Sequence, residues 1–330
     1  MKKCIIILFC LIQIISKGQD PQFTQFFSNP LYLAPSFAGA TEASRITSMY
    51  RSQWRGVGDF ETYTFSYDHY FSGFNSGFGV LFLKDVAGSG DLGMTSIGLQ
   101  YSYDFKIFNT WHVRPGAYFN YIQTGIDYDK LYFSSQLGTT GESSGVVPPD
   151  RPAKEKVGDM DFSSSVLIYT KQFWIGGSVD HLLKPELSLY LTDDDIGYKY
   201  SLFSGVELIK KGHLLKPLDE SLTFATLYKM QNDYKQLDFG LYWFKMPIVA
   251  GIWLRGIPKA YGDSKKRLQI GDALALLVGY KVQQFSVGYS YDFTISRLIT
   301  STQGSHEVSL VYHFRYQRKK KITAIPCPSF

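Results

Sequence analysis

One pentapeptide, YSYDF, occurs twice in the chain, at residues 101–105 and 289–293, and a near copy, FSYDH, lies at 65–69. Side chains of an extended strand alternate between two faces, so the aromatic residues of this motif share one face while its Ser and Asp share the other. Asp104 and Asp292 therefore fall on a small, polar face. A single copy would fit a strand of a soluble sandwich, but the repetition favours a membrane β-barrel with an aromatic outside and a polar lumen.

The same period-two alternation continues in segments of about ten residues, the length that a tilted strand needs to cross a membrane. No amphipathic helix of convincing length is present. We predict an all-β fold, a transmembrane antiparallel β-barrel of about 14 strands. The expected strands are 44–54, 60–70, 74–84, 93–106, 111–122, 161–170, 172–181, 197–210, 220–230, 234–244, 247–256, 268–280, 283–294 and 304–316.

The connections between these segments alternate in length, as expected for a barrel with both termini in the periplasm. Three tight turns, TKQ, KMP and KVQ, fall on the predicted periplasmic side. Four longer connections, DVAGSGDLG, LLKPELSLYLTDDDI, GIPKAYGDSKKR and ISRLITSTQG, fall outside. Three connections depart from this alternation: RGVGD and MQND are short loops on the outside, and KKGHLLKPLD is a longer connection on the periplasmic side. The longest connection, about 123–160, is rich in Gly, Ser, Pro and charge, and is expected to lie outside or in the lumen.

Residues 1–18 have the layout of a signal peptide. Lys2 and Lys3 precede an apolar run of about a dozen residues, too short for a spanning helix. Small residues near Gly18 suit cleavage before Gln19. We therefore expect export, then a signal peptide at 1–18, an irregular segment at 19–43, a barrel at 44–316 and a basic periplasmic tail at 317–330.

Composition supports this class of protein. The chain holds 24 Tyr, 25 Phe and 30 Gly, an excess typical of membrane barrels. The formal charge of +5 falls to +2 once the three leader lysines are removed, which gives no indication of nucleic-acid binding. A lipoprotein signal at Cys10 is disfavoured by the bulky Phe9 before it. Only Cys327 then remains, so no intrachain disulfide is possible.

Motifs that usually carry chemistry lack their structural context here. GSGDLG at 88–93 is followed by a strand pattern, whereas a dinucleotide site needs a helix next. GESSG at 141–145 lies in a Pro-rich loop, whereas a nucleophile elbow needs a strand and a helix. A calcium site at Asp193–Asp195 is disfavoured against a solvated loop. The six histidines lack metal-ligand spacing, so we expect no catalytic residue, cofactor or metal.

The dense basic run after the last strand faces the periplasm in this topology. It is either a solvated tail beside anionic lipid headgroups or a docking site for a periplasmic partner. The candidate docking residues are Arg318, Lys319, Lys320 and Lys321.

The start of the chain after the leader, QDPQFTQFFSNPLYLAPSFAG, followed by YRSQW at 50–54 and SYD at 66–68, closely resembles the PorP/SprF family of outer-membrane proteins of the type IX secretion and gliding machinery of Bacteroidetes. CPSF at 327–330 also resembles the family's ending. Ala34 departs from the family pattern, which usually has Asn there. The matched positions are Gln22, Gln25, Asn29, Pro30, Pro35, Gly39, Tyr50, Arg51, Gln53 and Trp54.

The resemblance implies a non-enzymatic outer-membrane barrel that helps to secrete large adhesin-like substrates or to retain them at the surface. Its implied partners are the C-terminal domain of a secreted substrate, periplasmic lipoproteins of the machinery and outer-membrane lipid. A channel for small or apolar solutes on the same fold is the alternative. A barrel hydrolase is a weaker one, because no adjacent Ser and His stand out.

The segment at 19–40 is aromatic yet interrupted by Pro21, Pro30 and Pro35, so it can be neither a helix nor a central strand. Irregular backbone at membrane depth is tolerated only inside protein or water. We expect a plug in the periplasmic half of the lumen, in which Gln25 and Asn29 satisfy backbone groups and the aromatic residues are buried. The alternative is a disordered periplasmic lead-in.

Overall fold

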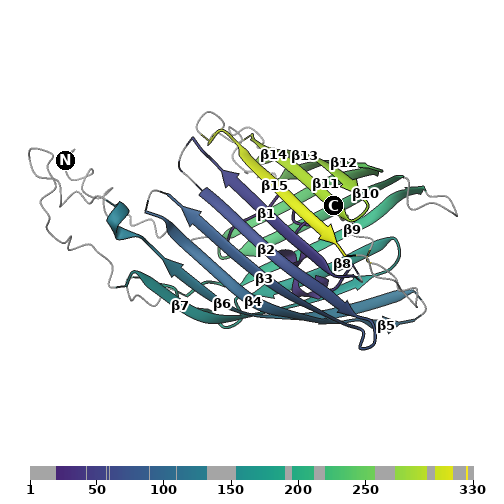
Figure 1. Ribbon diagram of the computed structural model, residues 1–330, viewed down its shortest axis with the longest axis horizontal. Helices are drawn as coiled ribbons and strands as arrows, with labels where there is room; N and C mark the ends of the chain where they lie inside the picture. The colour runs from purple at the N-terminus through teal and green to yellow at the C-terminus, as the bar shows by residue number, and fades with distance from the viewer. Residues whose placement is uncertain are drawn as a thin grey trace, which may run out of the picture.

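The alternating segments form strands that wrap into a single tilted wall, seen from the side in Figure 1. The computed structural model describes residues 20–41, 43–56, 58, 60–88, 90–108, 110–131, 154–189, 195–211, 220–256, 272–295, 302–314 and 325. No helix among these residues is long and apolar enough to cross a membrane. The expected signal peptide, the GESSG motif, the candidate docking residues 318–321 and Cys327 lie outside the described residues.

The strands follow one another around the wall in chain order. They are β1 (Arg45–Gln53), β2 (Phe60–Phe71), β3 (Ser76–Ala87), β4 (Leu92–Tyr103), β5 (Phe105–Ile107), β6 (Trp111–Gly125), β7 (Lys156–Tyr169), β8 (Phe173–Asp180), β9 (Lys199–Lys211), β10 (Glu220–Gln231), β11 (Tyr234–Lys245), β12 (Ile248–Arg255), β13 (Ala273–Val282), β14 (Phe285–Thr294) and β15 (Ser305–His313). The short helices are α2 (Pro30–Leu33), η1 (Pro35–Phe37) and η2 (Tyr128–Lys130).

The wall is closed. The first strand, β1, pairs with the last, β15, and all neighbouring strands are antiparallel, so no long sheet edge is left open. Both β4 and β5 pair with β6, so these two labels mark one wall position. The gap in that ladder falls at Arg114 and Pro115, and a proline has no N–H to donate to a neighbouring strand. The barrel therefore has fourteen wall positions, which confirms the predicted fold class.

The faces of the strands also follow the sequence pattern. In the two YSYDF copies, Tyr101 and Tyr289 are exposed on the outside, each with 41% of its surface accessible. Asp104 and Asp292 are buried on the inside. The outer face is an apolar band of Phe, Leu, Val, Ile and Tyr side chains. This arrangement is that of a barrel whose outside meets lipid.

The two ends of the barrel differ. One, the short-turn end, includes the connections 170–172, 246–247 and 283–284. The other, the long-loop end, includes the connections 181–198, 256–272 and 295–304. The expected long connection DVAGSGDLG is wrong, because β3 runs to Ala87 and β4 starts at Leu92, leaving a tight turn. The strand β4 begins within GSGDLG, so a strand and not a helix continues from this motif, as the sequence indicated.

Candidate functional site

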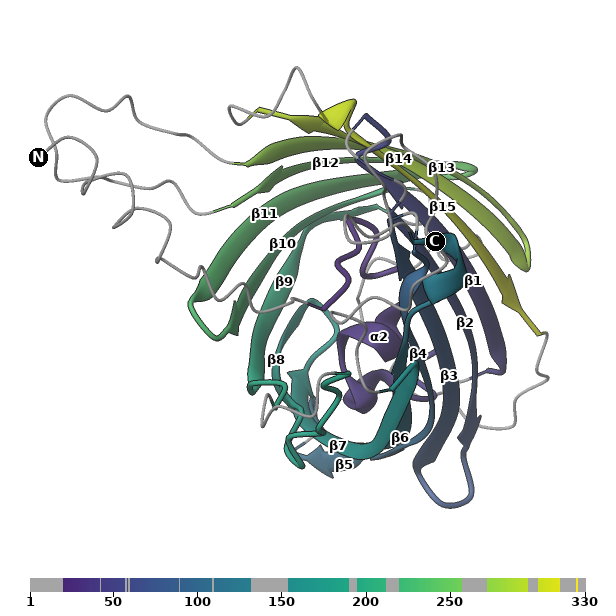
Figure 2. The ribbon, with the colours of Figure 1, turned by 90° about the vertical axis from the view of Figure 1, so that its left-hand side faces the viewer.

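The lumen is occupied by the start of the chain. Residues 20–41, here called the lumen segment, are enclosed by the barrel wall, and α2 is visible inside the barrel in Figure 2. Residues 23–40 are buried, except for the half-buried Tyr32. The segment begins at the long-loop end, where Asp20 bonds to Lys199 of β9, and ends near Asp68 of β2 at the short-turn end. It therefore runs through both halves of the lumen, so the expected location in the periplasmic half alone is wrong.

Prolines shape the lumen segment without excluding helix. Pro30 is the first residue of α2, and Pro35 is the first residue of η1. A proline fits the first turn because the N–H it lacks would have no partner there. Ala34 between them is extended, with φ −165° and ψ 141°. The expectation of a helix-free segment is therefore wrong at the scale of single turns.

Glycines of the wall create hollows into which the lumen segment fits. A Cβ atom added at Gly77 would lie 1.9 Å from the Ala38 carbonyl oxygen, and one at Gly116 would lie 2.3 Å from the Ser36 nitrogen. At Gly288 the same atom would lie 2.5 Å from Gln25 Oε1. At Gly77 and Gly116 the near atoms are backbone, so only glycine allows the two backbones to approach so closely, whereas the near atom at Gly288 is the end of a side chain. The wall backbone is thus fitted to this segment at two strands, β3 and β6.

Apolar side chains of the segment pack against one side of the lumen. Phe27 lies 5.9 Å from Trp174 and from Tyr242 between ring centroids, and Phe26 lies 4.7 Å from Trp253 in an edge-to-face arrangement. The cluster continues over β7–β13 with Leu167, Tyr169, Phe203, Ala225, Leu227, Val249, Ala275 and Leu277. This aromatic part of the lumen was not anticipated, because the sequence pattern predicted a polar lumen.

A buried ionic cluster lies on neighbouring strands of the wall. Arg51 of β1 pairs with Asp292 of β14 and Glu307 of β15, each at 2.8 Å. Arg255 of β12 reaches the same Asp292 carboxylate at 2.7 Å. The hydroxyl of Thr24 donates to Asp292 at 2.7 Å. The charges are therefore paired across four strands and joined to the lumen segment, as buried charges require.

Glu307 holds the backbone of the segment. Its two carboxylate oxygens accept hydrogen bonds from the backbone N–H of Thr24 at 2.9 Å and of Gln25 at 2.7 Å. The side chain of Gln25 then donates to Ser290 and to the Glu307 carbonyl, and accepts from Ser309 at 2.7 Å. The irregular backbone thus finds in the wall the partners that regular structure would supply.

A second ionic cluster anchors the first residue of the segment. Asp20 lies 2.6 Å from Lys199 and 3.0 Å from His181, which also bonds to Asp161 at 2.8 Å. Burial opposes ionisation of Asp20, but Lys199 and His181 outweigh it and hold the pKa of Asp20 well below its usual value. Burial likewise opposes charge on His181, yet the carboxylates of Asp20 and Asp161 raise the pKa of His181 to about 10. The ring is therefore charged at neutral pH.

The short-turn end fixes the other extremity. Gly39, with φ +68°, donates its N–H to Asp68 at 2.8 Å, and Asp68 pairs with Arg45 at 2.9 Å. The Ala38 carbonyl accepts from Arg114 and from Ser102. A positive φ suits glycine at this reversal. The segment is therefore held at both ends as well as in the middle.

The family-motif positions divide into two sets. Gln22 accepts from Arg255 at 3.2 Å and Asn29 donates to Thr64 at 2.8 Å, while Gln53 accepts from Arg51 at 3.3 Å. Together with Gln25, Pro30, Pro35, Gly39 and Arg51, these positions build the interface between segment and wall.

The other two motif residues lie elsewhere. Tyr50 faces outward and donates to Glu61 at 2.7 Å, and Trp54 directly follows β1, with φ +56°.

Sequence reasoning missed most of the wall partners. Glu307, Arg255, His181 and Lys199 were not singled out, since nothing local marks a strand residue as the partner of a distant one. Asp292 had a signal, its inward place in the repeated YSYDF. Among the described residues no group of three His, Cys, Asp or Glu side chains is arranged to hold a metal ion. Asp195 instead pairs with Lys184 at 3.3 Å.

Solved outer-membrane proteins are similar to this barrel in fold alone. Among solved structures it is similar to the Acinetobacter baumannii outer membrane protein Omp33, with 9% identity, 84% of this chain and 100% of that chain covered, and a TM-score of 0.46. The CymD monoaromatic hydrocarbon channel is 11% identical, with 88% of this chain and 93% of that chain covered and a TM-score of 0.45. The P. putida toluene transporter TodX is 8% identical, with 86% of this chain and 93% of that chain covered and a TM-score of 0.43. A comparison with curated proteins gave no match.

The family comparison is decisive. Residues 15–312 match the family described as type IX secretion system membrane protein PorP/SprF. The match covers the lumen segment and nearly the whole wall, and it confirms the resemblance carried by the amino-terminal motif. The chain belongs to the PorP/SprF family of type IX secretion system membrane proteins.

Proposed function

We propose that this chain is a non-enzymatic, plugged outer-membrane barrel that the type IX machinery uses to secrete adhesin-like substrates or to attach them at the cell surface. Family membership supports the link to secretion. The closed wall with its apolar outer band supports a place in a bilayer, and long loops of such barrels face outward. The expected partners remain the C-terminal domain of a substrate, periplasmic lipoproteins and outer-membrane lipid.

The observation that carries this proposal is the filled lumen. The lumen segment is held by two ionic clusters, by glycine hollows and by an aromatic cluster. Among the described residues, two cavities beside it, next to Asp20 and Tyr32, measure about 20 Å³ and 60 Å³. Each holds at most a few water molecules. A wall stiffened around a fixed core suits a docking platform for a protein better than a passage for solutes.

The second candidate is a channel for small or apolar solutes. The aromatic surface of β7–β13, around Trp174 and Trp253, would suit apolar molecules if the lumen segment withdrew. The two readings differ in the ion conductance of the resting barrel.

Single-channel recording in planar bilayers separates them. We expect the purified wild-type barrel to show no sustained conductance. A variant without residues 20–40 should open, provided that circular dichroism shows an intact sheet. If the variant does not fold, the wild-type recording decides alone, because a steady open state would contradict the plug. Equal conductance of the two folded proteins would also contradict it.

A further inference from the structure

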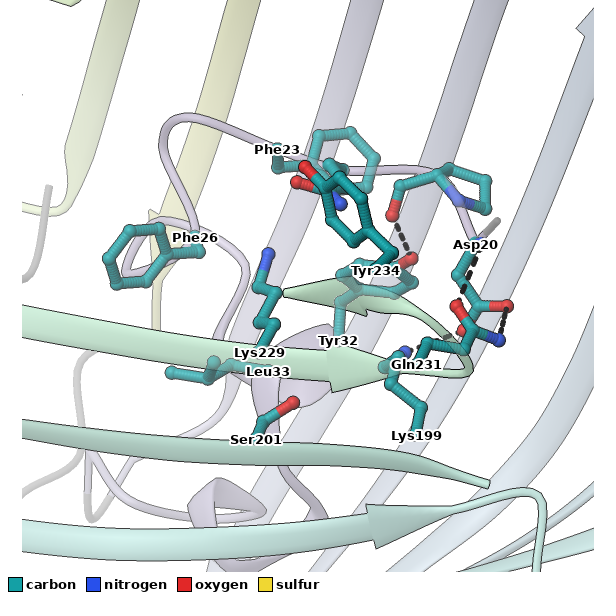
Figure 3. Close-up of a pocket in the computed structure, with 12 residues that line it drawn as sticks. Asp20, Phe23, Phe26, Tyr32, Leu33, Lys199, Ser201, Lys229, Gln231 and Tyr234 are labelled. Atoms are coloured by element: carbon teal, nitrogen blue, oxygen red, sulfur yellow. Dashed lines mark hydrogen bonds and ion pairs between the residues drawn. The ribbon is translucent and has the colours of Figure 1, made fainter. Parts of the chain in front are cut away.

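A pocket lies between the lumen segment and strands β9–β11 at the long-loop end (Figure 3). Phe23, Phe26, Tyr32 and Leu33 of the segment form one side. The wall contributes Lys199, Ser201, Lys229, Gln231 and Tyr234. Lys229 extends from β10 toward the segment, and its ammonium group points into the space below Tyr234. The pocket therefore combines an apolar flank with a cation.

The charged groups that line this pocket differ in whether they have a partner of opposite charge. Asp20 pairs with Lys199 and His181 and accepts from Gln231 at 3.2 Å. Lys199 also lies 3.4 Å from Asp180. The side chain of Lys229, in contrast, makes no ion pair and no hydrogen bond within the part of the chain that the structure describes. A half-buried lysine amine without a partner is unusual, because its charged form is stable away from water only when an opposite charge accompanies it.

Among the described residues, no carboxylate forms an ion pair with the Lys229 side chain. The charged groups near enough to act on it are the Asp238 carboxylate and the cations of Arg255, Lys199 and Arg51. Asp238 is engaged elsewhere, since it accepts from Gln236 at 2.7 Å and from the Gly256 N–H at 3.1 Å. The local field at the ammonium is thus set by several cations and one occupied carboxylate, which favours a further anion.

We propose that this pocket binds a carboxylate group of a partner polypeptide, with Lys229 as the cation that receives it. The cavity of about 20 Å³ has room for about one or two water molecules, and the two oxygens of a carboxylate would take their place. Phe26 and Leu33 beside it suit the apolar atoms that carry such a group. The choice of a polypeptide as the source rests on the proposed function, because the pocket lies at the long-loop end, which that function turns toward the substrate.

The first test uses sodium acetate as the probe. The thermal midpoint of the purified barrel in detergent is measured in acetate and in chloride at equal ionic strength. We expect acetate to raise the midpoint by a few degrees in wild type and in the control Lys235→Met, which removes an exposed cation from the next strand. Lys229→Met should lose the response. Equal responses of Lys229→Met and wild type would overturn the site, and equal effects of chloride and acetate would overturn its assignment to carboxylates.

The second test identifies the source of the carboxylate. Crosslinked complexes are purified from outer membranes that carry wild type, Lys229→Met or Lys235→Met. We expect roughly tenfold less partner with Lys229→Met, as for loss of one charged hydrogen bond. Equal recovery would overturn the docking role while the proposed function stands. An acetate response without any protein partner would refute the proposed function and leave a site for free small anions.

Discussion

Replacement of Gly77 by alanine tests how tightly the wall fits the lumen segment. The new methyl group would lie 1.9 Å from the Ala38 carbonyl oxygen, whereas ordinary contact begins at 3.4 Å. The carbonyl must therefore withdraw by about 1.5 Å, the difference between these distances. That shift breaks the bond from Ser102, now 2.8 Å, and the bond from the Arg114 guanidinium. One neutral and one charge-assisted hydrogen bond are together worth about 3 kcal/mol.

The assay is denaturant unfolding of the refolded barrel in detergent, followed by circular dichroism. Gly73→Ala is the matched control, since it lies in the turn before β3 and its Cβ would meet nothing within 4 Å. We expect Gly77→Ala to lower the free energy of unfolding by about 3 kcal/mol relative to Gly73→Ala. Equal stability of the two variants would refute the fit of wall and segment.

Three further predictions concern the anchors of the segment. Arg51→Met leaves the Glu307 carboxylate buried without its arginine, so the free energy of unfolding should fall by about 3–5 kcal/mol; no loss would contradict the ionic cluster. Since the pKa of His181 is raised to about 10, its contribution to stability is complete below pH 6.5 and is lost as pH rises toward 10. Unfolding measured across that window should show the decline in wild type and not in His181→Gln. An epitope inserted between Gln19 and Asp20 should bind antibody on intact cells, because Asp20 lies at the long-loop end and long loops face the cell exterior. Binding only after permeabilisation would contradict this direction of the segment.

Much of the wall could be predicted because its signal is local. Alternation assigns each residue to a face without knowledge of its neighbours, so all fourteen wall positions and the inward Asp104 and Asp292 were predicted. Where both faces are apolar, the signal fails. In LYWF of β11, Tyr242 points inward and is buried while Leu241 and Trp243 are exposed, and composition alone cannot separate them.

The candidate site could be predicted only in part, since its contacts join distant positions. Arg51 meets Glu307 across 256 residues and Gln25 meets the same residue across 282. A single sequence holds no record of such pairings. The motif contains Gln25 and Arg51, but their partners and the direction of the segment through the lumen came from the structure.

The most direct measurement is a crosslinking purification of this barrel from outer membranes, followed by mass spectrometry of what remains bound. The proposed function predicts recovery of a large secreted protein with a C-terminal sorting domain, which would be the attached substrate. Recovery of periplasmic lipoproteins alone would assign the barrel to the core machinery instead. Recovery of no stable partner, together with solute flux through the barrel in liposomes, would contradict the proposed function and establish a channel.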